Sequence, residues 1–135
     1  MIGIKARNIK SKDPNISKAI LTKYKEGLIK TGYIFTENID NSDMTLILSI
    51  TNFFAETRQG FAKITINADC CINVALSTKN NDTVLYTTEI CGNGEVAKAT
   101  GFIKNVQEAL FLSVDDVLSK LINDEGLINS VNTNK

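Results

Sequence analysis

The sequence predicts an α+β domain: a two-layer sandwich in which two helices cover one face of a mostly antiparallel sheet. The first observation is an alternation of apolar and polar residues over 60–76, which is typical of a long strand with one buried face. Its even positions are Ile64, Ile66, Ala68, Cys70, Ile72, Val74 and Leu76, and its odd positions are Lys63, Thr65, Asn67, Asp69, Cys71, Asn73 and Ala75. The second observation is that apolar residues recur at helical spacing over 14–31 and 101–123. We expect the order β-α-β-β-β-β-α.

The first predicted elements are a short strand over Ile2–Ala6 and a helix over 14–31. Asp13 is a favoured N-cap residue, and Pro14 is favoured at the first helical position. Gly32 suits the left-handed position that ends a helix. One apolar stripe of this helix should face the sheet, and it contains Ile16, Ile20, Tyr24, Gly27 and Leu28.

Four strands separated by polar turns are expected after the first helix. Alternation predicts strands over Tyr33–Glu37, from Met44 to Thr51 and as far as Phe54, over 61–77, and over Val84–Ile90. Turn-forming residues separate these strands at Asn38–Ser42, Glu56–Gly60 and Asn80–Asp82. After the last strand, Gly92-Asn93-Gly94 is expected to loosen the chain as a bulge or a flexible exit.

The second predicted helix runs from about Gly101 to Asn123. Its wide apolar stripe contains Phe102, Val106, Ala109, Leu110, Val114 (or Ser113), Val117, Leu118, Leu121 and Ile122. Residues from Asp124 onward are polar and rich in asparagine, so we expect them to fray. The predicted organisation is therefore a single domain over 1–123, followed by a polar, flexible tail over 124–135.

Composition limits the functions open to the chain. Of its 135 residues, 43% are hydrophobic and 22% are charged, as in an ordinary globular protein. Fifteen basic and 15 acidic residues give no net charge, which argues against non-specific nucleic-acid binding. The absence of histidine excludes Ser-His-Asp and Cys-His catalytic arrangements. Three cysteines without a C-x-x-C spacing do not suggest a zinc site, so we expect no metal and no cofactor.

The three cysteines, Cys70, Cys71 and Cys91, all fall in the predicted hairpin. A three-residue turn over 80–82 sets Cys71 opposite Cys91 on the polar face, whereas a two-residue turn would pair Cys70 with Cys91 and bury Glu89. Directly opposed Cβ atoms lie about 4.5–5.5 Å apart, near but slightly beyond disulfide geometry. Two outcomes stay open: a Cys71–Cys91 bridge, which implies an oxidising compartment, or three thiols with no bond.

No group of residues in the sequence has the pattern of a catalytic site. Gly92-Asn93-Gly94-Glu95 contains a G-x-G, but no third glycine or Lys-Ser pair follows at phosphate-binding spacing. Asp115 and Asp116 are adjacent and so point to different parts of a helix surface. The pair Asp124-Glu125 lies in the predicted tail. We therefore predict that the protein is not an enzyme.

Two groups of residues are candidates for an interaction surface. Phe53, Phe54 and Phe61 flank the predicted turn, either as a local cluster under the loop or as an exposed aromatic patch. The first helix carries several lysines, including Lys18 and Lys25, which form either a solvated face or a surface for anionic lipid or an acidic partner.

The sequence also resembles a known family over nearly its whole length, from Ile2 to about Leu127. A helix ending in Leu28-Ile29-Lys30-Thr31-Gly32-Tyr33 leads into Asp43-Met44-Thr45-Leu46, Arg58-Gln59-Gly60 opens the long strand, and the last helix closes with Leu118-Ser119-Lys120-Leu121-Ile122-Asn123-Asp124. These features resemble the YajG-like family of bacterial lipoproteins. The resemblance implies a lipid-anchored protein on the periplasmic side of a Gram-negative outer membrane, without established catalytic residues.

The beginning of the chain departs from that pattern. Met1–Lys5 lacks the apolar core of a signal peptide, and Cys70 and Cys71 lie mid-strand and cannot carry the anchor. We therefore expect either a cytosolic protein or a form from which a signal peptide and lipidated cysteine have been removed. The main hypothesis is the soluble part of a non-enzymatic envelope lipoprotein that acts as an accessory or protein-interaction module, with an unknown protein partner. The alternatives are a small-ligand or lipid-binding module and a cytosolic partner-binding domain.

Overall fold

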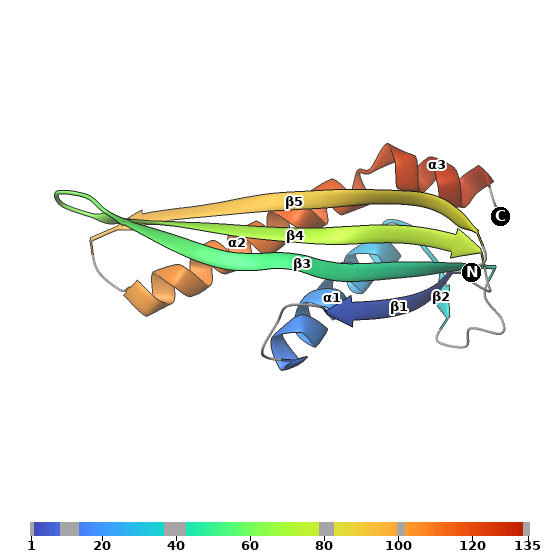
Figure 1. Cartoon of the computed structure of the whole chain (residues 1–135), viewed down its shortest axis with the longest axis horizontal. Coiled ribbons are helices and arrows are strands. Elements are labelled where there is room, and N and C mark those ends of the chain that lie inside the picture. Colours follow the sequence, from blue (N-terminus) through green and yellow to red (C-terminus); the bar gives the residue numbers. More distant parts are fainter. Residues whose placement is uncertain (1, 9–13, 37–42, 79–82, 100–101, 134–135) are drawn as a thin grey trace.

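A computed structural model describes residues 2–8, 14–36, 43–78, 83–99 and 102–133 of the chain. Its elements follow in the order β1, α1, β2, β3, β4, β5, α2 and α3 (Figure 1). The strands are β1 Ile2–Asn8, β2 Phe35–Thr36, β3 Met44–Gln59, β4 Ile64–Thr78 and β5 Val84–Lys98, and the helices are α1 Pro14–Lys30, α2 Phe102–Ile122 and α3 Glu125–Thr133. The predicted α+β class is confirmed.

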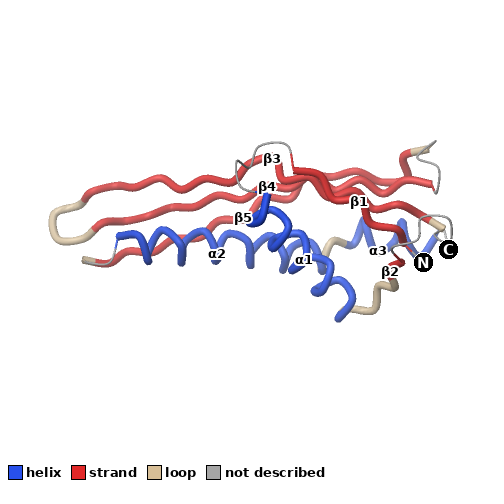
Figure 2. The backbone as a smooth tube through the Cα atoms, turned by 90° about the horizontal axis from the view of Figure 1, so that it is seen from below, coloured by secondary structure: helices blue, strands red, loops and turns tan. Residues whose placement is uncertain are grey.

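The five strands form one sheet in the order β2-β1-β3-β4-β5, and α1 and α2 lie on the same face of it (Figure 2). The long strands β3, β4 and β5 pair antiparallel, whereas β1 pairs parallel with both β2 and β3. The sheet is therefore mixed, with its antiparallel part much the larger, and the two-layer arrangement is as predicted. β4 lies inside the sheet, and β5 forms one of its edges.

The helix α1 ends at a left-handed glycine, as predicted. Gly32 has a φ of 108°, a conformation that glycine adopts without the steric cost of a Cβ. The N–H of Tyr33 donates to the carbonyl of Leu28 and the N–H of Gly32 to that of Ile29, which together form a Schellman motif. The expected N-cap, Asp13, lies outside the described residues, as do the expected turns at Asn38–Ser42 and Asn80–Asp82.

The strand β3 is longer than predicted, and a bulge divides it. The turn expected at Glu56–Gly60 is wrong, because the strand continues to Gln59 and the chain reverses over Gly60–Lys63. The register shifts between Ile50 and Asn52, so Thr51 is the extra residue. Because the bulge adds one residue, even positions face the helices before it and odd positions face them after it. Of the strand expected over Tyr33–Glu37, the structure shows β2 at Phe35–Thr36, and Glu37 lies outside the described residues.

The strand β5 also runs past the point where it was expected to end. Gly92-Asn93-Gly94 is regular strand and pairs with Cys70, Asp69 and Ala68 of β4. The prediction of a bulge or flexible exit is wrong because these glycines have a packing role. A Cβ on Gly94 would lie 2.2 Å from the carbonyl oxygen of Ala109, and one on Gly92 would lie 2.6 Å from that of Ser113. Glycine at both positions lets α2 approach β5 closely.

The main core lies between the helices and the sheet. As predicted, the even positions of β4 from Ile66 to Leu76 are buried. On α1 the predicted stripe is buried at Ile20, Tyr24 and Leu28, whereas Ile16 is 47% exposed. The core consists of Ile20, Tyr24, Leu28, Met44, Leu46, Leu48, Ile50, Cys70, Ile72, Val74, Leu76, Ile90, Val114, Val117, Leu121, Leu127 and Val131.

Two members of this core come from the segment expected to be a flexible tail. Residues Glu125–Thr133 form α3, and Leu127 and Val131 are buried against the core. The hydroxyl of Tyr86 donates to Asp124 Oδ2 at 2.8 Å, at the start of this helix. The expectation that the chain frays from Asp124 is therefore wrong over these residues, because Leu127 and Val131, spaced by one helical turn, are buried on the same face of the helix.

The sheet also extends well beyond α1 as a long arm (Figures 1 and 2). There β3, β4 and β5 are covered only by the N-terminal half of α2. A second, smaller core holds the arm together and consists of Ile66, Ala68, Val96 and Ala109. The β3–β4 turn lies at the far end of this arm, opposite the end of the molecule at which β1 begins.

Candidate functional site

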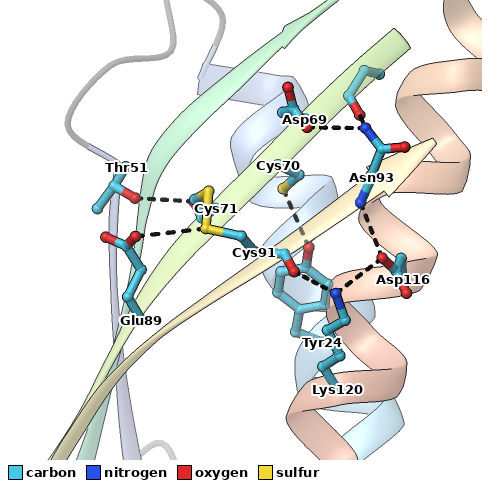
Figure 3. Close-up of a disulfide and its surroundings, with 11 residues drawn as sticks. Tyr24, Thr51, Asp69, Cys70, Cys71, Glu89, Cys91, Asn93, Asp116 and Lys120 are labelled. Atoms are coloured by element: carbon cyan, nitrogen blue, oxygen red, sulfur yellow. Dashed lines mark hydrogen bonds and ion pairs between the residues drawn. A yellow bond between two sulfur atoms is a disulfide. The ribbon is translucent and has the colours of Figure 1, made fainter. Parts of the chain in front are cut away.

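The hairpin of β4 and β5 places the three cysteines on two faces of the sheet. Cys71 lies directly opposite Cys91 on the outer face, and Ile72 lies opposite Ile90 on the inner face. This is the register that a three-residue turn predicts. In it the structure joins Cys71 and Cys91 in a disulfide with a Cα–Cα distance of 4.1 Å, and Cys70 is a buried free thiol (Figure 3).

The buried thiol of Cys70 contacts Tyr24, which the sequence indicated only as a core residue. Tyr24 Oη lies 3.6 Å from Cys70 Sγ and donates to the carbonyl oxygen of Val114 at 3.4 Å. Burial raises the pKa of both groups above their usual values, and the neighbouring thiol adds to the increase for Tyr24. Both groups are therefore neutral at physiological pH, and the pair is a packing contact between α1 and β4.

On the outer face, the carboxylate of Glu89 lies close to the disulfide, with Oε1 3.5 Å from Cys91 Sγ. Glu89, Cys71 and Cys91 offer three atoms within 4.8 Å of one another, which is a spacing that a metal ion could use. In the oxidised form the two sulfurs are bonded to each other and provide no thiolate, which is the form of cysteine that binds metals. The oxidised cluster therefore acts as a covalent crosslink between the strands.

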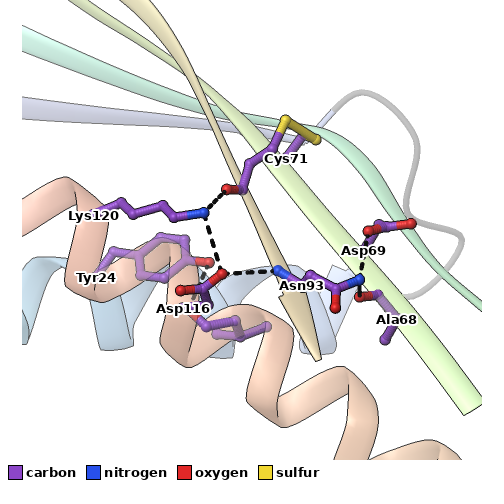
Figure 4. A network of polar contacts seen from close by, with 9 residues as sticks. Tyr24, Ala68, Asp69, Cys71, Asn93, Asp116 and Lys120 are labelled. Carbon is purple, nitrogen blue, oxygen red and sulfur yellow. Dashed lines mark hydrogen bonds and ion pairs between the residues drawn. A yellow bond between two sulfur atoms is a disulfide. The ribbon is translucent and has the colours of Figure 1, made fainter. Parts of the chain in front are cut away.

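A chain of polar contacts ties the edge strand β5 to α2 (Figure 4). Lys120 Nζ donates to the carbonyl oxygen of Cys91 at 2.8 Å, and the N–H of Asn93 donates to Asp116 Oδ2 at 3.0 Å. Asp116 and Lys120 also form an ion pair at 3.2 Å. The Asn93 N–H, with Lys120 beside it, lowers the pKa of the Asp116 carboxyl. These side chains satisfy backbone groups that an edge strand would otherwise leave unpaired.

The side chain of Asn93 extends this chain of contacts across the outer face. Its Nδ2 donates to the carbonyl oxygen of Ala68 at 3.1 Å and to Asp69 Oδ1 at 3.0 Å. Sequence reasoning did not single out Asn93, Asp116 and Lys120 as a group. Their connection depends on α2 crossing β5 at the two glycines, and no local pattern in the sequence predicts that crossing.

The other acidic pairs are also used in holding elements together. Asp115 points away from Asp116, as expected for adjacent helical residues, and pairs with Lys23 of α1 at 2.5 Å. Both of these side chains are about half exposed, so the pair contributes little to stability. Asp124 accepts the Tyr86 hydroxyl. The structure thus gives Asp115 and Asp116 different partners on different elements.

The five candidate contact residues do not form one surface. The side chain of Phe53 is half-buried and packs on the main core, whereas Phe54 lies on the opposite face and is 39% exposed. Phe61 is fully exposed at the turn of the β3–β4 hairpin. Lys18 is exposed and Lys25 half-buried, both on α1. The predicted local cluster of three phenylalanines is wrong, because β3 does not turn at Glu56 and its alternation sends neighbouring residues to opposite faces.

Among the helices in the described ranges, none combines the length and the apolar character needed to cross a membrane.

Comparison with solved structures relates this arrangement to a class of bacterial proteins. A DUF330 protein of Xanthomonas campestris superposes with a TM-score of 0.71 at 10% identity, covering 99% of this chain and 87% of its own. A minor lipoprotein of Acinetobacter baumannii gives 0.57 at 12% identity, covering 98% of this chain and 91% of its own. A lipoprotein of Neisseria meningitidis gives 0.50 at 12% identity, with coverages of 98% and 97%.

The chain therefore has a fold that it shares with bacterial lipoproteins over almost its entire length. No family model matches the sequence, and no curated protein matches it in sequence.

Proposed function

We propose that this chain is the soluble part of a non-enzymatic, YajG-like lipoprotein that acts through protein contacts on the periplasmic face of the outer membrane. The observation that carries the proposal is the Cys71–Cys91 disulfide on the outer face of the sheet. Disulfides persist in oxidising compartments such as the periplasm and are rare in the cytosol. The fold shared with bacterial lipoproteins supports the same compartment.

The polar contacts of the structure support a non-enzymatic role. Asn93, Asp116 and Lys120 bind one another and the backbone of β5, and Tyr86 binds Asp124. The contacts of Asn93 with Asp116 and of Lys120 with the Cys91 carbonyl join β5 to α2, the ion pair of Asp116 with Lys120 lies within α2, and the contact of Tyr86 with Asp124 holds the segment before α3 on β5. Between the helices and the sheet, where a small-ligand module would bind its ligand, the described residues include the apolar side chains of the main core. These observations favour a protein-interaction module over the small-ligand alternative.

The state of the three thiols in cells tests the compartment. The gene, with its native upstream sequence, would be expressed in a Gram-negative host. The thiols would be preserved by acid quench and then labelled with a maleimide–polyethylene glycol at neutral pH, where the thiolate reacts. We expect Cys70 to be labelled only after denaturation, and Cys71 and Cys91 only after denaturation and reduction. A Cys71→Ser variant is the control, because it frees Cys91 for labelling. Three thiols labelled without reduction would contradict the periplasmic proposal and favour the cytosolic one.

Attachment to the outer membrane and contact with a protein partner are tested by two separate experiments. Density-gradient separation of the membranes should place the full-length protein with the outer membrane, and recovery in the soluble fraction would contradict the anchor.

A photo-crosslinking amino acid at position 18 or 54, both exposed, should give a discrete adduct with an envelope protein in cells. The same probe at exposed Asn129 of α3 is the control. Absence of adducts at both test positions would contradict the protein-contact role.

A further inference from the structure

The sequence contains one short motif twice, and the fold brings both copies to the same end of the molecule. Gly60-Phe61-Ala62-Lys63 forms the turn between β3 and β4. The second copy is Gly101-Phe102-Ile103-Lys104, of which Phe102, Ile103 and Lys104 are the first residues of α2. The β3–β4 turn and the start of α2 both lie at the far end of the arm (Figures 1 and 2). The pairing of β4 with β5 also brings the two copies together, because Ile64, beside the turn, pairs with Lys98, shortly before α2.

The apolar side chains of both copies project into solvent. Phe61 has a relative exposure of 109%, so its ring is as accessible as in an extended peptide, and Phe102 and Ile103 are 51% and 73% exposed. Phenylalanine and isoleucine are among the residues most often buried in folded proteins. Three of them exposed at one end of the molecule mark a contact surface.

The two segments at this end carry basic residues and no acidic ones. The segments 57–63 and 98–104 contain four basic residues, Arg58, Lys63, Lys98 and Lys104, and no acidic residue. Lys98 binds Glu108 at 3.2 Å, one turn further along α2. Arg58, Lys63 and Lys104 are exposed, and among the residues that the structure describes they form no ion pair. We call the set Arg58, Phe61, Lys63, Phe102, Ile103 and Lys104 the arm tip.

We propose that the arm tip binds the surface of an anionic lipid bilayer, with Phe61, Phe102 and Ile103 entering the headgroup region and the three cations contacting lipid phosphates. Exposed apolar side chains bordered by cations are the pattern of interfacial binding, in which burial of apolar area and attraction to anionic lipids act together. The flexible stems of Lys63 and Lys104 allow their ammonium groups to stay at the headgroups while the rings enter more deeply.

The composition of the arm tip favours a lipid surface over a protein partner. Protein–protein interfaces are enriched in aromatic residues and arginine but depleted in lysine. Here two of the three unpaired cations are lysines. Phe61 is also fully exposed at the turn, so its ring can enter a fluid surface without a complementary pocket. The proposal does not rest on the proposed lipid anchor or on the oxidising compartment.

Vesicle flotation with the purified chain tests the proposal. We expect binding to vesicles of phosphatidylcholine with phosphatidylglycerol, weak binding to phosphatidylcholine alone, and loss of binding as salt is raised. The double variant Phe61→Ser, Phe102→Ser should lower the vesicle affinity by at least about tenfold. Lys63→Gln with Lys104→Gln should lower it by about fivefold for each charge removed.

Matched variants separate the arm tip from the rest of the surface. Phe111 is 66% exposed but lies further along α2, so Phe111→Ser should leave vesicle binding unchanged. Lys18→Gln with Lys30→Gln, on α1, should also have no effect. Circular dichroism and thermal melting would show that each variant is folded.

Three results would overturn the proposal: no binding to either vesicle, equal binding to both vesicles at all salt concentrations, or equal losses in the control variants and the arm-tip variants. Absence of vesicle binding would favour an acidic protein as the partner of this end. None of these results bears on the thiol labelling that tests the compartment.

Discussion

Adjacent cysteines in β4 have opposite environments because side chains in a strand alternate between faces. Cys71 lies on the outer face and reaches Cys91 across the ladder, whereas Cys70 lies on the inner face against Tyr24. Two adjacent residues thus provide a disulfide on the outer face and a fully buried thiol on the inner face. The alternation was visible in the sequence, and it sufficed to assign Cys70 to the core.

The buried pair should make the stability of the protein decrease at alkaline pH. Burial raises the pKa of Cys70 above its usual 9.0 and that of Tyr24 above its usual 10.0. Between the unfolded and folded pKa values the folded state holds protons that the unfolded chain has lost, so the free energy of unfolding falls as pH rises. Denaturant titrations at steps above pH 9 would measure this decrease. Tyr24→Phe and Cys70→Ala should each give a shallower pH dependence, and an unchanged slope in both would show that neither group contributes.

A single methyl group at Gly94 should be strongly destabilising. The Cβ of Gly94→Ala would meet the Ala109 carbonyl oxygen at 2.2 Å and Leu112 Cβ at 2.7 Å, so α2 must move away from β5. We expect a loss of about 3 kcal/mol, as for a severe overpacking substitution. Gly60→Ala is the control, because its Cβ meets only the Lys63 carbonyl oxygen, at 3.1 Å. Equal unfolding free energies for the two variants, measured in denaturant, would show that α2 does not approach β5 this closely.

At the scale of elements, the sequence predicted those parts whose signals are local. The register that sets Cys71 opposite Cys91 agrees with the alternation of both strands, although the ladder shifts between Leu76 and Ser77 near the turn, and Gly32 marks the end of α1. The ends of β3 and β5 were missed because polar residues and glycines there resemble turns. Their strand structure depends on pairing with β4 and, for Gly92 and Gly94, on the close approach of α2. The bulge at Thr51 was missed for a similar reason. It changes which side chains face the helices, and this change can be recognised only when the strand is known to continue well past residue 51.

Deleting Thr51 should test the role of the bulge. Without the extra residue, the positions after 51 would exchange faces, and Phe53 and Ala55 would leave the inner side of the sheet. We expect a loss of at least about 2 kcal/mol, from the lost burial of Phe53 against the main core. Thr51→Ala keeps the bulge and removes only the hydrogen bond from Oγ1 to the Cys71 carbonyl, so it should cost about 1 kcal/mol. If the deletion is as stable as Thr51→Ala in denaturant, the faces after the bulge do not matter for stability.

For the whole molecule, the order of the strands could not be predicted from the sequence. β1 lies between β2 and β3 and pairs parallel with both, which brings the N-terminus into the middle of the sheet. Parallel pairing joins segments distant in sequence, and no turn residues set its register. The candidate site has the same limit. The register that sets Cys71 opposite Cys91 could be predicted, but whether they are bonded stayed open, and the contacts of Asn93, Asp116 and Lys120 depend on two elements that meet only in the folded chain.

The C-terminal helix gives the last test, because the sequence suggested a flexible tail where the structure has part of the core. Leu127 is fully buried, and α3 lies against Tyr86 of β5, since a Cβ on Gly126 would come within 2.4 Å of the Tyr86 hydroxyl. Leu127→Ala should therefore lower the free energy of unfolding by about 2–5 kcal/mol, as for other large-to-small core substitutions. Asn129→Ala, at an exposed position of the same helix, should change it by less than about 0.5 kcal/mol. Thermal and denaturant unfolding of both variants would decide, and equal stabilities would mean that α3 detaches in solution without cost to the rest of the fold.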